Sequence, residues 1–210
     1  MKSAIVLICL LSVIQPAFAQ STKKSFWQLS CPEKWWVVTH PFVANKARKI
    51  TADVIRICEE MKKDSLLDGD AAGGQVDAFR HAYWMAALSQ KICRRKAIAL
   101  GKAHEKGDYR KFNRGKVDDE LNIPDSISSV MDLFNNEIGA SIGCQNNDLD
   151  TVSLKKLIRS NIIQGKMKII SKNSEGKILD CDWNVLDIKL YLYVWNIPKC
   201  LVASDFQRRK

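Results

Sequence analysis

The most constraining feature of this sequence is a segment, roughly residues 76–94, that is apolar on nearly every side. A helix without a polar face must be surrounded by other elements, because no side of it suits contact with water. The segment therefore predicts a central helix that other helices cover. Its large apolar side chains are Phe79, Tyr83, Trp84, Met85 and Leu88.

Amphipathic patterns before and after this segment supply the covering helices. Apolar residues recur at steps of three and four over about 41–62, 97–106 and 151–163. A further helix begins near residue 126, after the start signal Pro124-Asp125-Ser126. The charged stretch 107–122 reads as a surface loop, and the tryptophans near Cys31 are expected to clamp the N-terminal segment onto the body. The expected stripe of the helix after residue 126 is Ile127, Val130, Met131, Phe134 and Ile138, and the tryptophans are Trp27, Trp35 and Trp36.

After Gly165 the pattern becomes strand-like. Residues 167–171 and 178–181, joined by a turn at 173–176, predict a β-hairpin. The expected fold class is mainly α: a single-domain helical bundle over 20–210, with a small C-terminal β-hairpin appendage at about 166–204.

The N-terminus has the pattern of a secretory signal peptide. Lys2 precedes the apolar run 4–11, and Ala17-Phe18-Ala19 offers a small-x-small cleavage site. We expect residues 1–19 to be removed and the mature chain to start at Gln20. The predicted location is periplasmic or extracellular, with no transmembrane segment.

Six cysteines remain after that cleavage, an even number that permits disulfides in an exported chain. Fifteen pairings are possible, and Cys181 with Cys200 is preferred because both flank one short C-terminal unit. Without a C-x-x-C spacing, a zinc site built from cysteines is disfavoured. Cys93 and Cys144 remain formal candidates for a nucleophile.

The formal net charge of +10 favours anionic surroundings. An anionic envelope component is the expected partner ahead of nucleic acid, although basic residues also serve simply to keep a surface soluble. Charge alone does not choose among these partners.

The loop 64–75 begins like a calcium-binding loop, with Asp68, Asp70 and Gly73. Ala72 and Phe79 stand where an EF-hand needs ligands, so an EF-hand is rejected. A looser calcium site that also uses Asp77 stays open, beside the simpler interpretation of a tight turn with a helix cap.

Three stretches place ionisable groups inside apolar, helix-forming sequence, where burial is costly unless the groups pair. They are residues 77–84, 103–105 and 131–139. Asp77 and His81 are four residues apart and therefore share one helix face, so the carboxylate can orient the imidazole. Arg80 can pair with Asp77 instead.

The first functional hypothesis is a metal-dependent hydrolase. His81, His104 and Asp132 would supply the nitrogen and oxygen ligands that zinc or another divalent ion favours. Glu105 would act as general base on bound water, or Asp77 would orient a ligand. The expected cofactor is thus a divalent metal, zinc or calcium. The candidate catalytic residues are Asp77, Arg80, His81, Glu105, Asn135 and Asn136.

Two other hypotheses compete with it. A His–carboxylate pair without metal can perform acid–base chemistry on water or a substrate hydroxyl. Alternatively, the same polar residues form a buried hydrogen-bond network in a structural or binding module with no catalytic role. A cavity open to solvent beside the histidines distinguishes a site from a network.

The ordered motifs resemble an uncharacterised bacterial family of exported proteins. The motif sequences are LSCPEKWW (29–36), GGQVDAFRHAYWMA (73–86), GKAHEKGDY (101–109) and PDSISSVMDLFNNEIG (124–139). The core is also similar to domains at the ends of large bacterial surface or toxin-like proteins. The resemblance covers most of the mature chain and implies a domain of unknown function, without a reaction. It marks Asp77, Arg80, His81, His104, Glu105, Asp132, Asn135 and Asn136 as motif residues.

Overall fold

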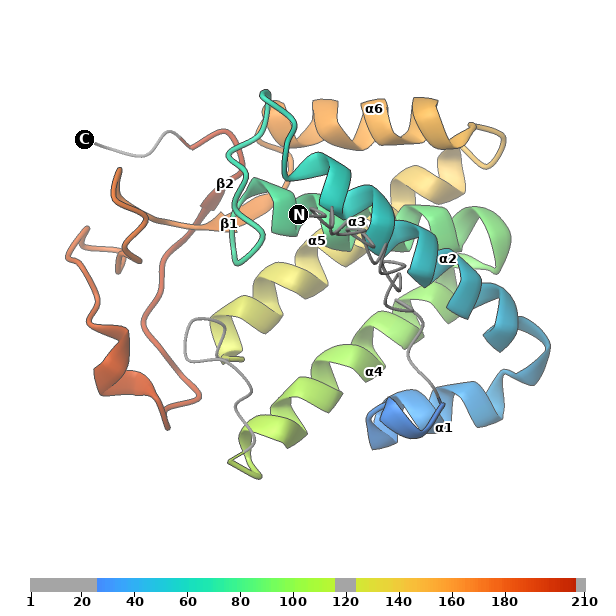
Figure 1. Ribbon diagram of the computed structural model, residues 1–210, viewed down its shortest axis with the longest axis horizontal. Helices are drawn as coiled ribbons and strands as arrows, with labels where there is room; N and C mark the ends of the chain where they lie inside the picture. The colour runs from blue at the N-terminus through green and yellow to red at the C-terminus, as the bar shows by residue number, and fades with distance from the viewer. Residues whose placement is uncertain (1–25, 116–123, 207–210) are drawn as a thin grey trace, which may run out of the picture.

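A computed structural model describes residues 26–115 and 124–206 of the chain. Within these ranges the fold is mainly α, with a two-stranded antiparallel sheet near the C-terminus (Figure 1). The expected signal sequence, residues 1–19, lies outside the described residues. The described elements are a 3₁₀ turn (Phe26–Gln28), α1 (Cys31–Thr39), α2 (Pro41–Met61), α3 (Gln75–Lys91), α4 (Arg94–Phe112), α5 (Ser126–Gln145), α6 (Thr151–Ile163), β1 (Lys168–Ile170), a second 3₁₀ turn (Ile188–Tyr191) and β2 (Leu201–Ala203).

The central-helix prediction is confirmed for α3. It packs against α2, α4, α5 and α6, most extensively against α5. Ala78, Phe79, Ala82, Met85 and Leu88 are fully buried. A helix in this position needs no polar face, because no side of it meets bulk water.

Side-chain caps define the starts of three of the surrounding helices. Ser30 and Glu33 form a reciprocal capping box at α1. Asp125 caps α5 and Asp150 caps α6. Pro41 opens α2, where its missing N–H costs nothing.

The small antiparallel pair near the C-terminus is present, but its main partner strand differs from the expectation. β1 pairs with β2, not with residues 178–181, which form the isolated bridges Lys172–Ile178 and Leu179–Val185. The Ser171 N–H donates to the Cys200 carbonyl, and residues 201–203 pair with β1 in the place expected for residues 178–181. The predicted disulfide between Cys181 and Cys200 is confirmed. This disulfide links the residue before β2, Cys200, to the loop that contains Cys181.

The expected loop 107–122 is wrong in its first part, because α4 continues to Phe112. Asp108 lies 3.7 Å from His104 one turn earlier and 3.2 Å from Lys111, which supports this extra turn of helix. Tyr109 and Phe112 also pack on Trp195. Sequence periodicity missed the extension because it is charged and only partly buried.

The expected roles of several large side chains need correction. Trp36 is buried, whereas Trp27 and Trp35 are 80% and 70% exposed, so only Trp36 anchors the N-terminal segment. On α5, Val130 and Phe134 are exposed, and Met131 is the buried member of the expected stripe. Helix α5 packs on α3 with one face. Val130 and Phe134 lie outside that face and remain exposed to solvent.

None of the helices in the described ranges is both long and apolar enough to cross a membrane.

Candidate metal centre

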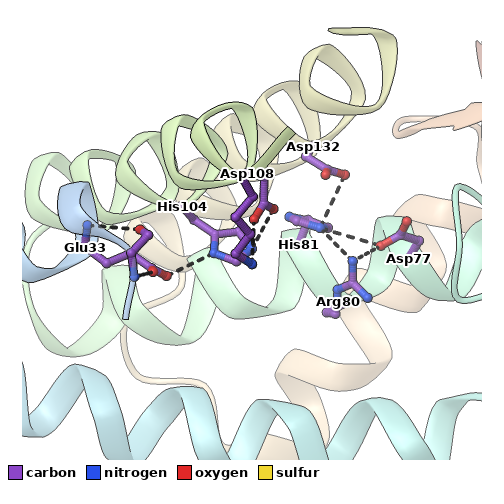
Figure 2. A network of polar contacts seen from close by, with 9 residues as sticks. Glu33, Asp77, Arg80, His81, His104, Asp108 and Asp132 are labelled. Atoms are coloured by element: carbon purple, nitrogen blue, oxygen red, sulfur yellow. Dashed lines mark hydrogen bonds and ion pairs between the residues drawn. The ribbon is translucent and has the colours of Figure 1, made fainter. Parts of the chain in front are cut away.

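Three of the motif side chains converge between α3 and α5. The Nε2 atom of His81 lies 3.3 Å from Oδ1 of Asp132 and 3.5 Å from Oδ1 of Asp77 (Figure 2). The three ligand atoms, one from each residue, all lie within 4.8 Å of one another. Among the described residues, this is the group of carboxylate, imidazole and thiol side chains that could hold a metal ion.

Local structure fixes two of these three residues. Asp77 and His81 are one turn apart on α3, as their spacing predicts. The Oδ2 atom of Asp77 accepts a 2.7 Å hydrogen bond from the Gly73 N–H, which holds the carboxylate at the helix start and leaves Oδ1 facing His81. Asp132 comes from α5, so the site depends on the packing of two helices.

Arg80 contacts the same ligand atoms of Asp77 and His81. One guanidinium nitrogen lies 2.5 Å from Oδ1 of Asp77 and 3.1 Å from Nε2 of His81. The side chain of Arg80 is 42% exposed, so it has room to turn away from the site. Arg80 therefore supplies positive charge at the point where a metal ion would bind.

The carboxyl groups of the centre are costly to ionise together. Burial, and then the charges of Asp77 and Glu105, hold the pKa of Asp132 well above its usual range. Burial likewise raises the pKa of Asp77, despite the nearby Arg80. Burial raises the pKa of Glu105 to about 7. A bound cation would relieve this clustering of negative charge.

The surroundings of His81 favour its neutral, unprotonated imidazole. Burial, and then the positive charges of Arg80 and His104, lower its pKa well below the usual value. A neutral imidazole is the form that binds metal ions. The Oδ1 atom of Asp132 is buried and makes no hydrogen bond to the protein, which is the condition of an oxygen available to a cation.

The centre opens into a polar cavity of about 760 Å³. Its floor carries Asp77, Arg80, His81 and Asp132 together with His104 and Glu105. Lys172 and Lys199 also line the cavity and are held in ion pairs with Asp70 and Asp125. A cavity of this size is suited to a small ligand, and its presence beside the histidines is the feature expected of a site.

Glu105 lies on α4 and lines the same cavity. Glu105 is 7% exposed, and its Oε1 atom makes no hydrogen bond to the protein. With a pKa near neutrality it can both accept and release a proton under ordinary conditions.

His104, predicted as a metal ligand, takes a different position from the three converging residues. Its Nδ1 atom lies 3.0 Å from Oε1 of Glu33, and its Nε2 atom lies 3.7 Å from Asp108 (Figure 2). It lines the polar cavity but does not belong to the group within 4.8 Å. The residues that the structure brings together as a group that could hold a metal ion are Asp77, His81 and Asp132.

Glu33 and Asp108 are the residues that sequence reasoning did not place near the site. Glu33 lies in the LSCPEKWW motif, and Asp108 follows His104 by four residues. The i,i+4 spacing was a usable signal for Asp108. Glu33 had none, because its contact with His104 spans 71 residues.

The two asparagines of the third motif differ in role: Asn135 binds the backbone, whereas Asn136 lies against His81, where a side-chain hydrogen bond favours the protonated imidazole. Asn135 is fully buried and forms two 2.9 Å hydrogen bonds with the backbone of Lys168, one from its Nδ2 atom and one to its Oδ1 atom. Asn136 is buried against Gly101, where an added Cβ would lie 2.9 Å from its Nδ2 atom. Neither asparagine lines the polar cavity.

The remaining candidates lie away from the centre. Cys93 and Cys144 are exposed free thiols and do not line the polar cavity. In the loop before α3, the Asp68 carboxylate accepts from the N–H groups of Asp70 and Gln75. The loop thus has the tight, carboxylate-capped turn that was the simpler of its two interpretations.

A model of the family described as a domain of unknown function, DUF6973, matches residues 34–168. That match spans more than half of the chain. The chain belongs to the DUF6973 family. The match runs from α1 into β1 and therefore includes all three converging residues. No curated protein and no solved structure matches the chain.

The limits of the DUF6973 domain divide the polar cavity into two parts. Its floor, with the three converging residues and Glu105, lies within the matched range. A second group of lining residues, including Lys172 and Lys199, lies after residue 168. The C-terminal segment therefore covers a site that the family domain supplies.

Proposed function

We propose that this chain is an exported, metal-dependent hydrolase in which Asp77, His81 and Asp132 hold a divalent cation at the floor of the polar cavity. One observation carries the proposal: three ligand atoms from two helices lie within 4.8 Å of one another beside a cavity. One imidazole and two carboxylates form a donor set that zinc accepts, with further positions left for water and substrate.

A cation in this position would lower the pKa of a bound water molecule and polarise the bond to be hydrolysed. Glu105 is the group best suited to take the proton from that water. It lines the same cavity, has an oxygen without a protein partner, and has a pKa raised to about 7. A general base is most effective when its pKa lies near the working pH.

Arg80 must move for the metal to bind, because it contacts both Asp77 and His81 through atoms that would be ligands. Its exposed side chain can reach the cavity, where its guanidinium would contact an anionic group of the substrate. The same contacts support the alternative function, a non-enzymatic binding module. In that alternative, Arg80 is the permanent counter-charge of a buried polar network.

The signal-like pattern of residues 1–19 supports the export part of the proposal, and the disulfide between Cys181 and Cys200 agrees with it. Disulfides persist in oxidising compartments such as the periplasm or the cell exterior. The net charge of +10 would favour substrates or partners with negative charge in that compartment.

The test is hydrolysis of chromogenic carboxylate esters and phosphodiesters by the purified protein, with and without chelator and with zinc added back. We expect chelation to remove activity and zinc to restore it. Glu105→Gln should lower kcat by about 100-fold to 10,000-fold. The matched control Glu59→Gln changes an exposed glutamate on α2 and should have no effect.

Activity that survives chelation would contradict the metal-dependent mechanism. A folded protein that binds zinc but hydrolyses none of these compounds would favour the binding module. Loss of activity in Glu59→Gln would show that the assay follows folding and not the site.

A further inference from the structure

A second cavity, of about 460 Å³, lies between α1, α2, α3 and α4. Its walls are mainly apolar side chains from these helices and from the preceding 3₁₀ turn. A cavity of this volume lies within the range of about 300–1,000 Å³ that holds small ligands. Its principal apolar lining residues are Phe26, Trp36, Val54, Ile55, Trp84 and Leu100.

The apolar and polar cavities share three lining residues beside the candidate metal centre. Arg80, His81 and His104 line both of them. A molecule that filled both would place an apolar part between α1 and α4 and a polar part beside Asp77 and Asp132. The bond between those two parts would then lie next to His81.

The rim of the apolar cavity carries exposed aromatic side chains. Phe26 lines the cavity and is 38% exposed, and its ring lies 5.5 Å from that of Trp27, which is 80% exposed. Exposed aromatic rings beside an apolar cavity are typical of proteins that take their ligand from a lipid surface.

We propose that the substrate of this site is a phospholipid with an anionic head group, whose acyl chain occupies the apolar cavity. The proposal rests on the proposed function, since it names the substrate class of the same centre. Hydrolysis would cleave an ester bond between the chain and the head group. Water would give its hydroxyl to the acid product and a proton to the alcohol product.

Two arginines that line the cavities favour an anionic head group. Arg48 lines the apolar cavity, and Arg80, which lines both, would be released to the head group when a cation replaces it beside Asp77. The chain as a whole carries a net charge of +10. Each methylene group buried in the apolar cavity would strengthen binding by about fourfold.

Tryptophan fluorescence provides a direct test, because Trp36 and Trp84 line the apolar cavity. The probe is lysophosphatidylglycerol with a brominated acyl chain, used below its micelle-forming concentration, since bromine quenches indole fluorescence on contact. We expect saturable quenching. Ala44→Phe, which fills the apolar cavity, should weaken binding by about tenfold or more, the equivalent of two buried methylene groups.

Ala99→Phe is the matched control, because Ala99 is a half-buried helical alanine that lies outside the apolar cavity. Chelator-treated wild-type protein separates this proposal from the metal proposal. It lacks the cation but should keep the quenching by the lysophospholipid within about threefold of the untreated protein, since the acyl chain lies in the apolar cavity.

Absence of saturable quenching in the wild-type protein would overturn the proposal, whatever the metal content. Unchanged affinity in a folded Ala44→Phe variant would also overturn it, because the chain would then bind elsewhere. Equal affinity for brominated lysophosphatidylcholine, whose head group has no net charge, would overturn the assignment of an anionic head group.

Discussion

Gly139 of α5 lies directly against the backbone of Ala82 on α3, so close that a Cβ atom at residue 139 would overlap the Ala82 carbonyl oxygen. Gly143 meets Ala86 in the same way one turn later. These contacts bring the backbones of the two helices together. They fix the distance between Asp132 on α5 and His81 on α3, and hence the candidate metal centre.

Gly139→Ala is therefore expected to destabilise the protein. Alanine gains about 1 kcal/mol of helix propensity over glycine. Overpacking a helix contact costs about 1–3 kcal/mol or more, and here the clashing atoms are backbone, which cannot turn aside. Urea denaturation should show a net loss of stability and a weaker affinity for metal. Val130→Ala, at an exposed position of α5, should change neither; equal stability of Gly139→Ala would contradict the close contact.

The pair formed by Glu33 and His104 should make stability depend on pH. Burial opposes ionisation of both groups, but their mutual hydrogen bond lowers the pKa of Glu33 to about 2 and raises the pKa of His104. The folded state thus holds the charged pair more strongly than the unfolded chain does. The stabilisation of the folded state by this pair is therefore largest between pH 4.5 and pH 6.5, the pKa values of Glu33 and His104 in the unfolded chain.

The contribution is lost as the pH falls from 4.5 towards 2, and also as the pH rises above 6.5 and through the raised pKa of His104. His104→Gln should lose about 1–3 kcal/mol near pH 5.5 and much less near pH 9. Denaturant titrations of wild type and variant across this range measure the difference. A difference that is the same at both pH values would show that the pair does not ionise in this way.

The disulfide between Cys181 and Cys200 closes a sequence separation of 19 residues. A loop of that length predicts that its removal costs about 2–4 kcal/mol. We expect the double variant Cys181→Ser, Cys200→Ser to lower Tm and to loosen the segment that covers the polar cavity. Limited proteolysis should then cut within residues 172–200. The control Cys144→Ser changes an exposed free thiol and should have the melting curve of wild type. A wild-type melting curve for the double variant would show that the disulfide does not stabilise the fold.

Much of the fold could be predicted because its signals are local. The apolar periodicity of 41–62 and 151–163 matched α2 and α6 closely, and the lack of a polar face identified α3 as central. The spacing of Asp77 and His81 placed both on one face of a helix. The motif order then indicated that Asp132 belongs with them.

The parts that sequence could not give depend on contacts between distant segments. β1 pairs with β2 because residues 199–203 return beside Ser171, and no local pattern specifies that return. His104 faces Glu33 on α1, although its place in the motif suggested a metal ligand. Asn135 binds the backbone of Lys168, a role that its neighbours in sequence do not reveal.

The most direct test of the central claim is a calorimetric titration of chelator-treated protein with zinc. The wild-type protein should bind one ion per chain, and Asp132→Asn should bind it at least about 100-fold more weakly, more than loss of an outer partner costs. His104→Gln should retain the ion, because His104 lies outside the converging group. Absence of binding by the folded wild-type protein, or equal affinity in folded Asp132→Asn, would contradict a metal centre formed by Asp77, His81 and Asp132.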